Sequence, residues 1–405
     1  MRRSILLIAF SLAAYGQTAL SLREAVSQAL KTHPQLAAGA ERITASEALR
    51  RQAALRPNPR LVLQTENLRA HGQPDFSFGQ DADTFAYLSQ VFETGGKRDR
   101  RVDAAASGVR QAQLERELVV RHIAARVKEA YWNAAGAERL HELLVETGRT
   151  FQQVVEFHEL RVREGAMAEA DLLRVRVEGE RLAMSANAAA LEAERARIQL
   201  FREMGQTEFP AVKFTDPLDD LGTAQVDADA GRALENRTEV KLARQAVEQM
   251  RAKVSLEQAS ARPDLDVLLG YKRTAGFNTV LGGVQVGLPF TNRNQGNVAA
   301  AEAEVRAAAA SLAAAQALVR AEVSAARTDY ELRRKQLTES LRSLREHAME
   351  SSSIALAAYR EGGTDLLRLL DAERVRLEVE VLYHRTLAEY RQSVVALETA
   401  MGVEP

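Results

Sequence analysis

Hydrophobic positions along the chain repeat with a helical period over most of its length and with a period of two in four short stretches. The helical pattern is clearest where apolar and small residues recur at alternating intervals of four and three, the spacing of a coiled-coil seam. Alternation of apolar and polar residues predicts strands at about 60–67, 84–93, 264–273 and 279–289. The seam comprises Ile123, Val127, Ala130, Ala134, Ala137, His141, Leu144, Gly148, Phe151, Val155, His158 and Val162.

Proline positions indicate how long the helices are. No proline lies between Pro74 and Pro210, or between Pro289 and Pro405. Because proline is the strongest helix breaker, these two stretches favour very long helices. We expect one from about 98 to 163 and another from about 295 to 359, each of about 66 residues and about 100 Å in length.

A tripeptide occurs twice, and the register around it is kept. Arg163-Glu164-Gly165 and Arg360-Glu361-Gly362 lie 197 positions apart, from 163 to 360. The same offset relates Leu172-Leu173 to Leu369-Leu370 and Met204-Gly205 to Met401-Gly402. Glycine adopts positive φ where a helix must end. We interpret both copies as tips of helical hairpins, with returning helices at about 168–204 and 366–401.

Each half of the chain therefore reads as helix, strand, strand, long helix, turn and returning helix. The opening helices are expected from the capping-type start Ser21-Leu22-Arg23-Glu24 to about Leu55, with Pro34 near the front, and from about 231 to 261. The predicted fold is mainly α with a small β part of four strands. We place the first repeat at 20–205, a linker at 206–230 and the second repeat at 231–402.

The N-terminus reads as a secretory signal peptide, residues 1–19. Met1-Arg2-Arg3 is followed by a short apolar run from Ile5 to Ala14 and by small and polar residues, with cleavage expected after Gly16 or Ala19. The run is too short for a membrane-spanning helix, which needs about 20 apolar residues. The chain has no cysteine, so we expect neither disulfides nor a lipid anchor.

Charge and motif content argue against an enzyme and against a nucleic-acid partner. The 54 basic and 55 acidic residues are balanced and form no basic block. No nucleophile–base pair or paired-carboxylate site is visible, and we expect no cofactor. The two seam histidines, His141 and His158, are too far apart in sequence for ligands on one helix, and we interpret them as packing positions. The other histidines form no cluster, so we expect no metal site.

Gly95-Gly96-Lys97-Arg98 follows the second strand directly. It lacks the spacing of a phosphate-binding loop and the buried strand that precedes one. We interpret these four residues as a strand-to-helix turn with its charge at a membrane boundary.

Four amphipathic strands of this length cannot close a barrel in lipid, where sheet edges leave backbone groups unsatisfied. Copies of the chain would have to share the task, giving eight strands from a dimer or twelve from a trimer. The long helices would then gather into a second cylinder continuous with the barrel. The physical interpretation is a conduit.

The duplicated plan, the strand pairs and the segment Tyr359-Arg360-Glu361-Gly362 through Leu369-Leu370-Asp371-Ala372 resemble the TolC-type outer-membrane factor family over essentially the whole mature chain. The resemblance implies a homotrimer with a twelve-stranded outer-membrane β-barrel continuous with a periplasmic α-helical barrel. It implies as partners a periplasmic adaptor (membrane fusion) protein, an inner-membrane pump of the resistance-nodulation-division type, and outer-membrane lipid of a Gram-negative bacterium. Gln90 to Arg98 resembles the branch for cobalt–zinc–cadmium cation efflux; the alternative is the same fold serving drug efflux or type I protein secretion.

The resemblance also implies roles for residues at the hairpin tips. Gly165 and Gly362 would form the periplasmic tip turns, with adaptor contacts at Arg163, Leu172, Arg360 and Leu369. Asp171 and Tyr359 match an inter-helix gate contact, and Asp371 matches a ring carboxylate of the pore constriction. Two positions depart from the family pattern: Arg368 replaces a second acidic ring, and Thr364 replaces a gate arginine. Rings of Arg368 beside Asp371 would pair internally or attract anions.

Two other classes of protein fit the sequence poorly. A periplasmic coiled-coil adaptor would have one hairpin and small β-barrel or lipoyl-like segments in place of two hairpins and four long strands. A structural coiled coil would have neither an export signal nor strand pairs.

Overall fold

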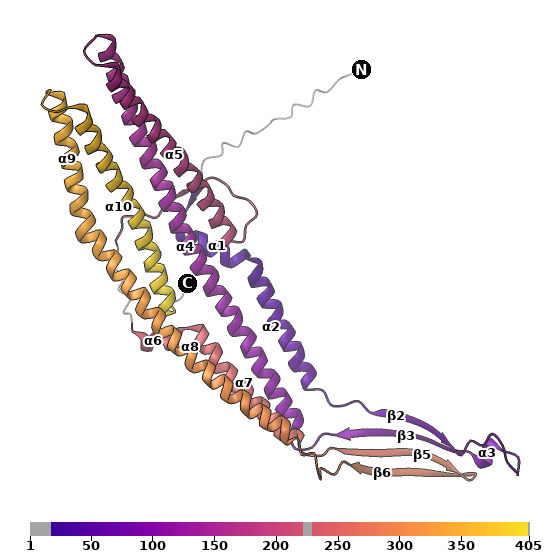
Figure 1. Cartoon of the computed structure of the whole chain (residues 1–405). Helices are drawn as coiled ribbons and strands as arrows, with labels where there is room; N and C mark the ends of the chain where they lie inside the picture. The colour runs from indigo at the N-terminus through magenta and orange to yellow at the C-terminus, as the bar shows by residue number, and fades with distance from the viewer. Residues whose placement is uncertain (1–17, 222–228, 404–405) are drawn as a thin grey trace, which may run out of the picture. The chain divides into compact units, whose positions relative to one another are not determined.

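The computed structural model describes residues 18–221 and 229–403, in which helices predominate (Figure 1). Residues 1–17, most of the predicted signal peptide, lie outside the described residues. The first repeat contains α1 (Leu22–Thr32), α2 (Pro34–Ala53), β2 (Arg60–Glu66), α3 (Phe78–Asp81), β3 (Asp83–Phe92), α4 (Lys97–Arg163) and α5 (Glu169–Glu203). The second contains α6 (Ala230–Asn236), α7 (Thr238–Ser260), β5 (Leu265–Thr274), β6 (Phe277–Val286), α8 (Gln295–Lys335), η1 (Gln336–Leu341), α9 (Arg342–Arg360) and α10 (Leu366–Met401).

The chain divides into two compact units. The hairpin unit consists of the described parts of Met1–Leu36, Val119–Asn236 and Val319–Pro405. The strand unit consists of Ala37–Leu118 and Arg237–Leu318. The long helices α4 and α8 begin in the strand unit and continue into the hairpin unit.

The core of the hairpin unit is built on one face of α4. Ile123, Val127 and Tyr131 are fully buried there, in a cluster with apolar residues of α1, α5, β1 (Thr18–Leu20) and β4 (Val212–Phe214). Further along the same helix, the seam residues Phe151 and Val155 are buried against α5 and α10. The alternating four-and-three spacing therefore marks the buried face of α4, as expected for paired helices.

A small parallel sheet joins the end of the predicted signal peptide to the predicted linker, where the sequence indicated no strand. β1 pairs with β4, so the described residues contain six strands, and the prediction of four was wrong by two short ones. Tyr131 donates a hydrogen bond to Asp216 Oδ2 (2.7 Å), which also accepts one from the backbone N–H of Leu22 (2.7 Å). Burial, with the Asp216 bond, raises the pKa of the Tyr131 phenol well above its usual range, so the hydroxyl remains a donor.

This sheet also bears on where the signal peptide would be cut. β1 begins at Thr18 and Leu20 is buried. Cleavage after Gly16 would leave the strand whole, whereas cleavage after Ala19 would remove two of its three residues.

Both opening helices are broken where the sequence predicted continuous ones. His33 separates α1 from α2 with φ −63° and ψ 125°, and Arg237 separates α6 from α7 with φ −63° and ψ 123°. The first break has a local cause, because the residue before a proline is disfavoured in the helical region. At the second, no proline follows, and Arg237 pairs with Glu239 in the first turn of α7 (2.8 Å).

The second long helix is not continuous either. The π-helical turn η1 separates α8 from α9, so the helix predicted at about 295–359 consists of three segments. Leu337 and Leu341 within η1 are buried. In the first repeat, by contrast, α4 runs unbroken over 67 residues.

The two hairpin tips have the same backbone design. Gly165 and Gly362 adopt φ of 72° and 76°. At each tip the residue after the glycine donates to a carbonyl five positions earlier: Ala166 to Arg161 and Gly363 to Ala358, both at 2.8 Å. This Schellman closure recurs with Gly205 and Gly402 at the opposite helix ends, so the duplication is preserved at the level of hydrogen bonds.

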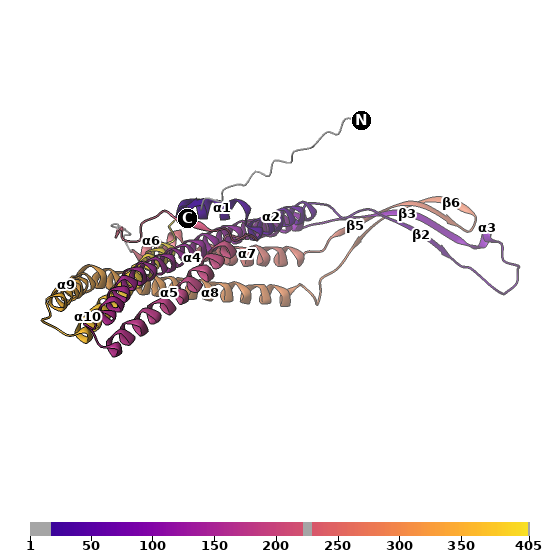
Figure 2. The same ribbon diagram turned by 90° about the horizontal axis from the view of Figure 1, so that it is seen from above.

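The strand unit contains a four-stranded antiparallel sheet in the order β2-β3-β5-β6. Its strands end within three residues of the ranges expected from the alternating pattern. The long helices of this unit lie beyond one end of the sheet, the short helix α3 lies at the other end, and none covers its faces (Figures 1 and 2).

Replacing Gly165 with alanine tests the tip design. A Cβ at this positive φ costs roughly 1–2 kcal/mol, so Gly165→Ala should lower the thermal unfolding midpoint. The matched control is Gly148→Ala, in the middle of α4 with open space around the added methyl, which should raise stability by about 0.5–1 kcal/mol. Equal effects of the two substitutions, measured by circular dichroism melting, would contradict the tip assignment.

Candidate functional site

The two faces of the four-stranded sheet differ in how many charged side chains they carry. Cross-strand partners share a face, so the register assigns every strand residue to one side. Eleven large apolar residues on one side are all exposed, from 37% for Val267 to 81% for Val280. They are Leu61, Leu63, Leu88, Phe92, Leu265, Val267, Leu269, Tyr271, Val280, Val284 and Val286.

The opposite face carries most of the charged side chains of the strands. Ser89 donates to Asp266 Oδ1 (2.7 Å), and Arg60 forms an ion pair with Asp266 Oδ2 (3.1 Å), so one polar cluster joins three strands. Lys272 lies over the Phe85 ring at 5.2 Å on the same face. An apolar outside and a polar inside is the pattern of a transmembrane barrel wall.

The outer strands of this sheet have unpaired edges. β2 pairs only with β3, and β6 only with β5, among the described residues. Because the four strands alternate in direction, β6 of one chain is antiparallel to β2 of a copy placed beside it. A chain alone can neither satisfy these two edges nor cover the apolar face.

The sheet meets the helices at the glycine turn that the sequence singled out. Gly95 and Gly96 have φ of 68° and 74°, as expected for the strand-to-helix turn. Lys97 then pairs with Asp264 Oδ1 (2.7 Å), which also accepts from the Thr94 N–H (3.0 Å). Burial alone would raise the pKa of Asp264, but the Lys97 and Thr94 bonds outweigh it and lower the pKa.

Two of the three arginines that follow this turn, Arg98 and Arg101, bind the C-terminal end of α2. Arg98 donates to the carbonyl of Ala54 (2.7 Å), and Arg101 to that of Ala53 (2.9 Å), at the C-terminal end of α2. Arg101 also pairs with Glu93. Lys97 therefore ties the start of α4 to the residue before β5, and Arg98 ties it to the end of α2, the helix that precedes the sheet.

At the hairpin end, Tyr359 makes a different contact from the one expected. Its hydroxyl lies 2.8 Å from Nε2 of His158 on α4, and the two rings stack with centroids 5.8 Å apart. Among the described residues, Asp171 and Tyr359 share no hydrogen bond; Asp171 pairs with Arg174 (3.6 Å). Within one chain the Tyr359 hydroxyl is bound to His158 and the Asp171 charge acts on it from nearby, so the Asp171–Tyr359 gate contact stays a prediction.

The charges at the two tips are inverted at equivalent repeat positions. With the offset of 197, Asp171 corresponds to Arg368 and Arg174 to Asp371. Asp371 pairs with Arg374 (2.6 Å) on its own helix and not with Arg368. The Arg368 side chain is exposed and forms no ion pair within the described part of the chain. Each tip therefore has its own charge pattern.

The residues expected to contact an adaptor fall into two groups. Arg163 and Arg360 are exposed at the tips, beside the turn glycines. Leu172 and Leu369 are buried between helices, so their side chains cannot meet a partner directly. Their neighbours Leu173 and Leu367 are 54% and 62% exposed and line an apolar groove between α5 and α10. Thr364, where the family has a gate arginine, is half-buried in the second tip.

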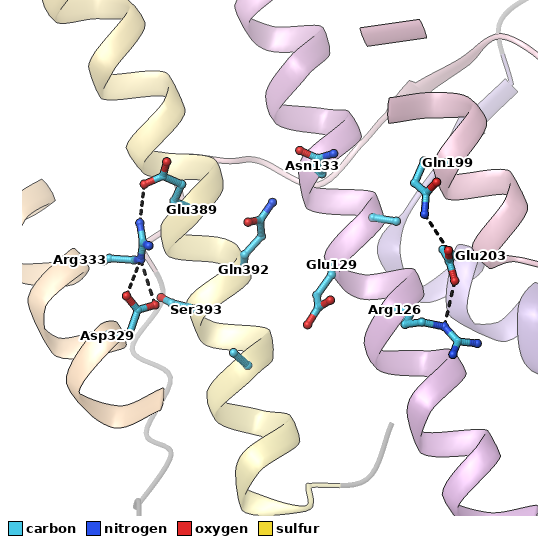
Figure 3. A pocket seen from close by; sticks show the side chains of 12 residues that line it. Arg126, Glu129, Asn133, Gln199, Glu203, Asp329, Arg333, Glu389, Gln392 and Ser393 are labelled. Atoms are coloured by element: carbon cyan, nitrogen blue, oxygen red, sulfur yellow. Dashed lines mark hydrogen bonds and ion pairs between the residues drawn. The ribbon is translucent and has the colours of Figure 1, made fainter. Parts of the chain in front are cut away.

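A polar groove of about 570 Å³ lies between α4, α5, α8 and α10 in the hairpin unit (Figure 3). Arg126 pairs with Glu203 (2.9 Å) on one side, and Arg333 with Asp329 (2.9 Å) and Glu389 on the other. Glu129 lies between these clusters in Figure 3; burial, with the Glu203 charge, raises its pKa. The groove borders the buried face of α4, because its lining residue Ala130 also belongs to the cluster of Ile123 and Val127.

The returning helix α5 exposes a row of apolar residues on its free side. Val177, Met184, Leu191 and Ile198 recur at intervals of seven, and all four are exposed. Such a row is the pattern of a helix that packs against a further helix. The regular spacing of seven makes this row of α5 detectable in the sequence. The seam of α4 is the longer and more regular hydrophobic pattern, and it is the one that the sequence analysis identifies.

Within residues 18–221 and 229–403, no group of three or more metal-ligating side chains is close enough to hold an ion. No helix in the same ranges combines the length and the apolar character needed to cross a membrane.

Comparison with known proteins identifies the class of fold first. The chain superposes on the outer membrane channel CmeC of Campylobacter jejuni with a TM-score of 0.79 at 18% identity, covering 99% of this chain and 94% of that one. At this identity the likeness shows the fold, that of an outer-membrane channel subunit.

The family follows from the sequence. The family model for outer membrane efflux proteins matches residues 25–206 and 230–403. The chain belongs to the outer membrane efflux protein family. It is 25% identical to the cobalt-zinc-cadmium resistance protein CzcC of Cupriavidus metallidurans, over 95% of this chain and 90% of that protein. It is 27% identical to the nickel and cobalt resistance protein CnrC of the same organism, over 71% and 68%.

Replacing Gly270 with alanine tests the sheet register. A Cβ there would lie 2.3 Å from the Cα of Tyr87 on β3, too close to fit without moving the backbone. Gly270→Ala should destabilise the sheet by about 1–3 kcal/mol or more, as overpacking does. Gly282→Ala on β6, where the added methyl meets nothing, is the control. The yield of folded, detergent-extracted protein is compared for the two variants. A normal yield for Gly270→Ala would refute the register.

Proposed function

We propose that this protein is the outer-membrane channel of a tripartite efflux system. Three copies would form a twelve-stranded barrel, continuous with a periplasmic tunnel made of their hairpins. An inner-membrane pump of the resistance-nodulation-division type and a periplasmic adaptor would deliver the substrate. Family membership supports the efflux role, and the amphipathic sheet with two open edges is the observation that carries the channel.

The sheet supports this assembly in three ways. The ten-residue strands β3, β5 and β6 match the nine to eleven residues that cross a bilayer when tilted. The exposed apolar face fits lipid, and the face with Arg60, Asp266 and Lys272 fits an aqueous lumen. Pairing β6 with β2 of the next copy satisfies both edges at once.

The helices support the same arrangement. The exposed apolar row of α5 needs a cover, and a neighbouring copy supplies helices of matching length. The polar groove around Glu129 is lined by charged side chains of α4, α5, α8 and α10, which suit a surface that meets water. At the tips, Arg163, Arg360, Leu173 and Leu367 form the surface we assign to the adaptor, while Tyr359, Asp171, Arg368 and Asp371 belong to the proposed constriction.

Heavy-metal cations are the proposed cargo, on the basis of the likeness to CzcC and CnrC. A strain lacking this gene should lose tolerance to zinc, cobalt or cadmium and keep tolerance to dyes and antibiotics. Restoration by the plasmid-borne gene is the control. Unchanged metal tolerance with lost dye tolerance would reassign the channel to drug efflux.

Channel formation is tested on purified protein in planar lipid bilayers. We expect stepwise, long-lived conductance increments at neutral pH. A preparation that is folded by circular dichroism and never conducts, even after the tip contacts are removed by substitution, would refute a channel.

Met184→Glu tests whether copies cover the α5 row. A carboxylate buried without a partner costs about 3–5 kcal/mol, so the variant should fall apart to single chains in mild detergent. Ser185→Glu, on the adjacent polar row with Glu178 and Glu192, should assemble normally. Size-exclusion chromatography with light scattering separates these outcomes. Intact assembly of Met184→Glu would show that no neighbouring copy covers this row.

A further inference from the structure

We propose that Arg273 binds a phosphate group of the glycolipid in the outward leaflet of the membrane, at the end of the sheet that lies away from the long helices. The inference rests on the proposed channel function, because that function places the sheet in an outer membrane and the helices on its periplasmic side. Arg273 lies near the end of β5, beside the turn that leads into β6. The short helix α3 lies at the same end of the sheet (Figure 2).

The strand register places Arg273 on the apolar face of the sheet. Successive residues of a strand point to opposite faces, so Arg273 shares its face with Tyr271. Its cross-strand partners are Thr84 on β3 and Asn278 on β6. Among the residues that β2, β3, β5 and β6 place on this face, Arg273 is the only charged one. A cation on the face that we assign to lipid needs an explanation.

The place of Arg273 along β5 is that of a membrane interface. An arginine on the lipid face of a barrel is strongly unfavourable at the middle of the bilayer and nearly neutral at its edge. The residues of β5 on this face are apolar up to Leu269, and Tyr271 and Arg273 follow at the far end. Tyr271 donates a hydrogen bond to Asn278 Oδ1 (2.5 Å). Tyrosine is typical of the level of the lipid headgroups, so Arg273 lies where headgroups begin.

The chain supplies no anion for this guanidinium. Within residues 18–221 and 229–403, Arg273 forms no ion pair or hydrogen bond, and its Nε–H is buried without an acceptor. Nη2 lies beside α3, because a Cβ built at Gly79 would be 3.5 Å from it. The residue as a whole is partly exposed. A guanidinium has several N–H donors and no acceptor, so Arg273 has donors left for an anion.

The carboxylates at this end of the sheet have other partners or lie on the other face. Asp81 of α3 pairs with Arg69 (3.0 Å). Glu66 and Asp83 are cross-strand partners on the polar face, and Asp83 accepts a hydrogen bond from Asn67 (2.8 Å). The anion that would neutralise the guanidinium therefore has to come from outside this chain. A partly buried cation left without one is unfavourable.

The surroundings of Arg273 fit an amphiphile that carries phosphate above its acyl chains. Phe78 of α3, next in sequence to Gly79, is 60% exposed and packs edge to face on Phe76 with centroids 6.5 Å apart. Arginine binds phosphate through parallel N–H bonds. In the proposed orientation this end of the sheet meets the outward leaflet, which in a Gram-negative outer membrane is a phosphorylated glycolipid. Phospholipid, by contrast, fills the periplasmic leaflet.

The site occurs once per chain. When Arg56-Pro57 is matched to Arg262-Pro263, Arg273 of the second repeat corresponds to Asn67 of the first. The first strand pair therefore has no cation at the equivalent position. We expect one bound glycolipid per chain.

The test is native mass spectrometry of the full-length assembly, first delipidated in detergent. The probes are diphosphoryl lipid A and a phosphate-free form with the same acyl chains. We expect the diphosphoryl form to bind with a dissociation constant at least about tenfold lower, the effect of a charge-assisted hydrogen bond. Equal affinity for the two forms would overturn the site.

Two neighbouring positions give a matched pair of variants. Arg273→Gln removes the charge and should abolish the preference for the phosphorylated form. Lys272→Gln removes the cation one position earlier, which lies over the Phe85 ring on the opposite face, and should keep the full preference. A preference that survives Arg273→Gln, or that falls equally in Lys272→Gln, would overturn the site. Arg273→Lys keeps the charge and should keep a preference; together with the unmodified chain it keeps the test decisive if Arg273→Gln fails to fold.

A second arm identifies which lipid the site holds in the cell. Assemblies are extracted from native membranes with a styrene–maleic acid polymer, and the lipids that remain after a detergent wash are identified. We expect phosphorylated glycolipid with the unmodified chain and its loss with Arg273→Gln. Retention of a phospholipid that depends on Arg273 would overturn the assignment to the outward leaflet.

Bilayer conductance, recorded on the same preparations, separates this result from the channel proposal. A preparation that conducts and shows no preference for phosphate contradicts the headgroup site alone. One that binds the phosphorylated lipid through Arg273 and never conducts contradicts the channel alone.

Discussion

The sheet of this protein cannot be satisfied by one chain. β2 and β6 each leave a row of backbone donors and acceptors without a partner, and eleven large apolar side chains cover one face. In water such a surface would aggregate, and in lipid the open edges would cost several kcal/mol per unpaired group. Closing the edges with identical copies, inside a bilayer, removes both problems. The rest of the chain is consistent with that solution, from the charged junction at Lys97 and Asp264 to the exposed row of α5.

The duplication gives both halves the same backbone but not the same chemistry. Each hairpin ends in the same glycine closure, and each returning helix begins at equivalent positions. The side chains at the tips differ, because an aspartate in one repeat corresponds to an arginine in the other. A histidine and a tyrosine meet at only one pairing of positions among the described residues. A symmetric scaffold thus carries an asymmetric contact, and the proposed gate depends on the side chains in which the two repeats differ.

Much of the fold follows from local signals in the sequence. Proline-free stretches, the four-and-three seam and the paired glycines indicate the long helices and their tips, because each signal acts within a few residues of the chain. The strands β2, β3, β5 and β6 follow from alternation. β1 and β4 are too short for a periodic signal, and η1 interrupts a helix without proline or glycine. No proline follows the break at Arg237, so no local signal in the sequence predicts it.

The site is harder to predict, because it depends on contacts between distant segments. The charged residues at the tips can be located from the repeat, but Arg374 as the partner of Asp371 and His158 as the partner of Tyr359 appear only after folding. His158 shows the limit most clearly. Its place on the seam indicates burial, while its role depends on a hydroxyl 201 positions away.

The most direct test of the account is cross-linking of the two open edges. Leu63→Cys on β2 and Val280→Cys on β6, in a chain without other cysteines, can be joined by a flexible bis-maleimide in native membranes. The account predicts covalent ladders between chains that end at three copies. Monomers alone, or ladders that continue beyond three, would contradict it.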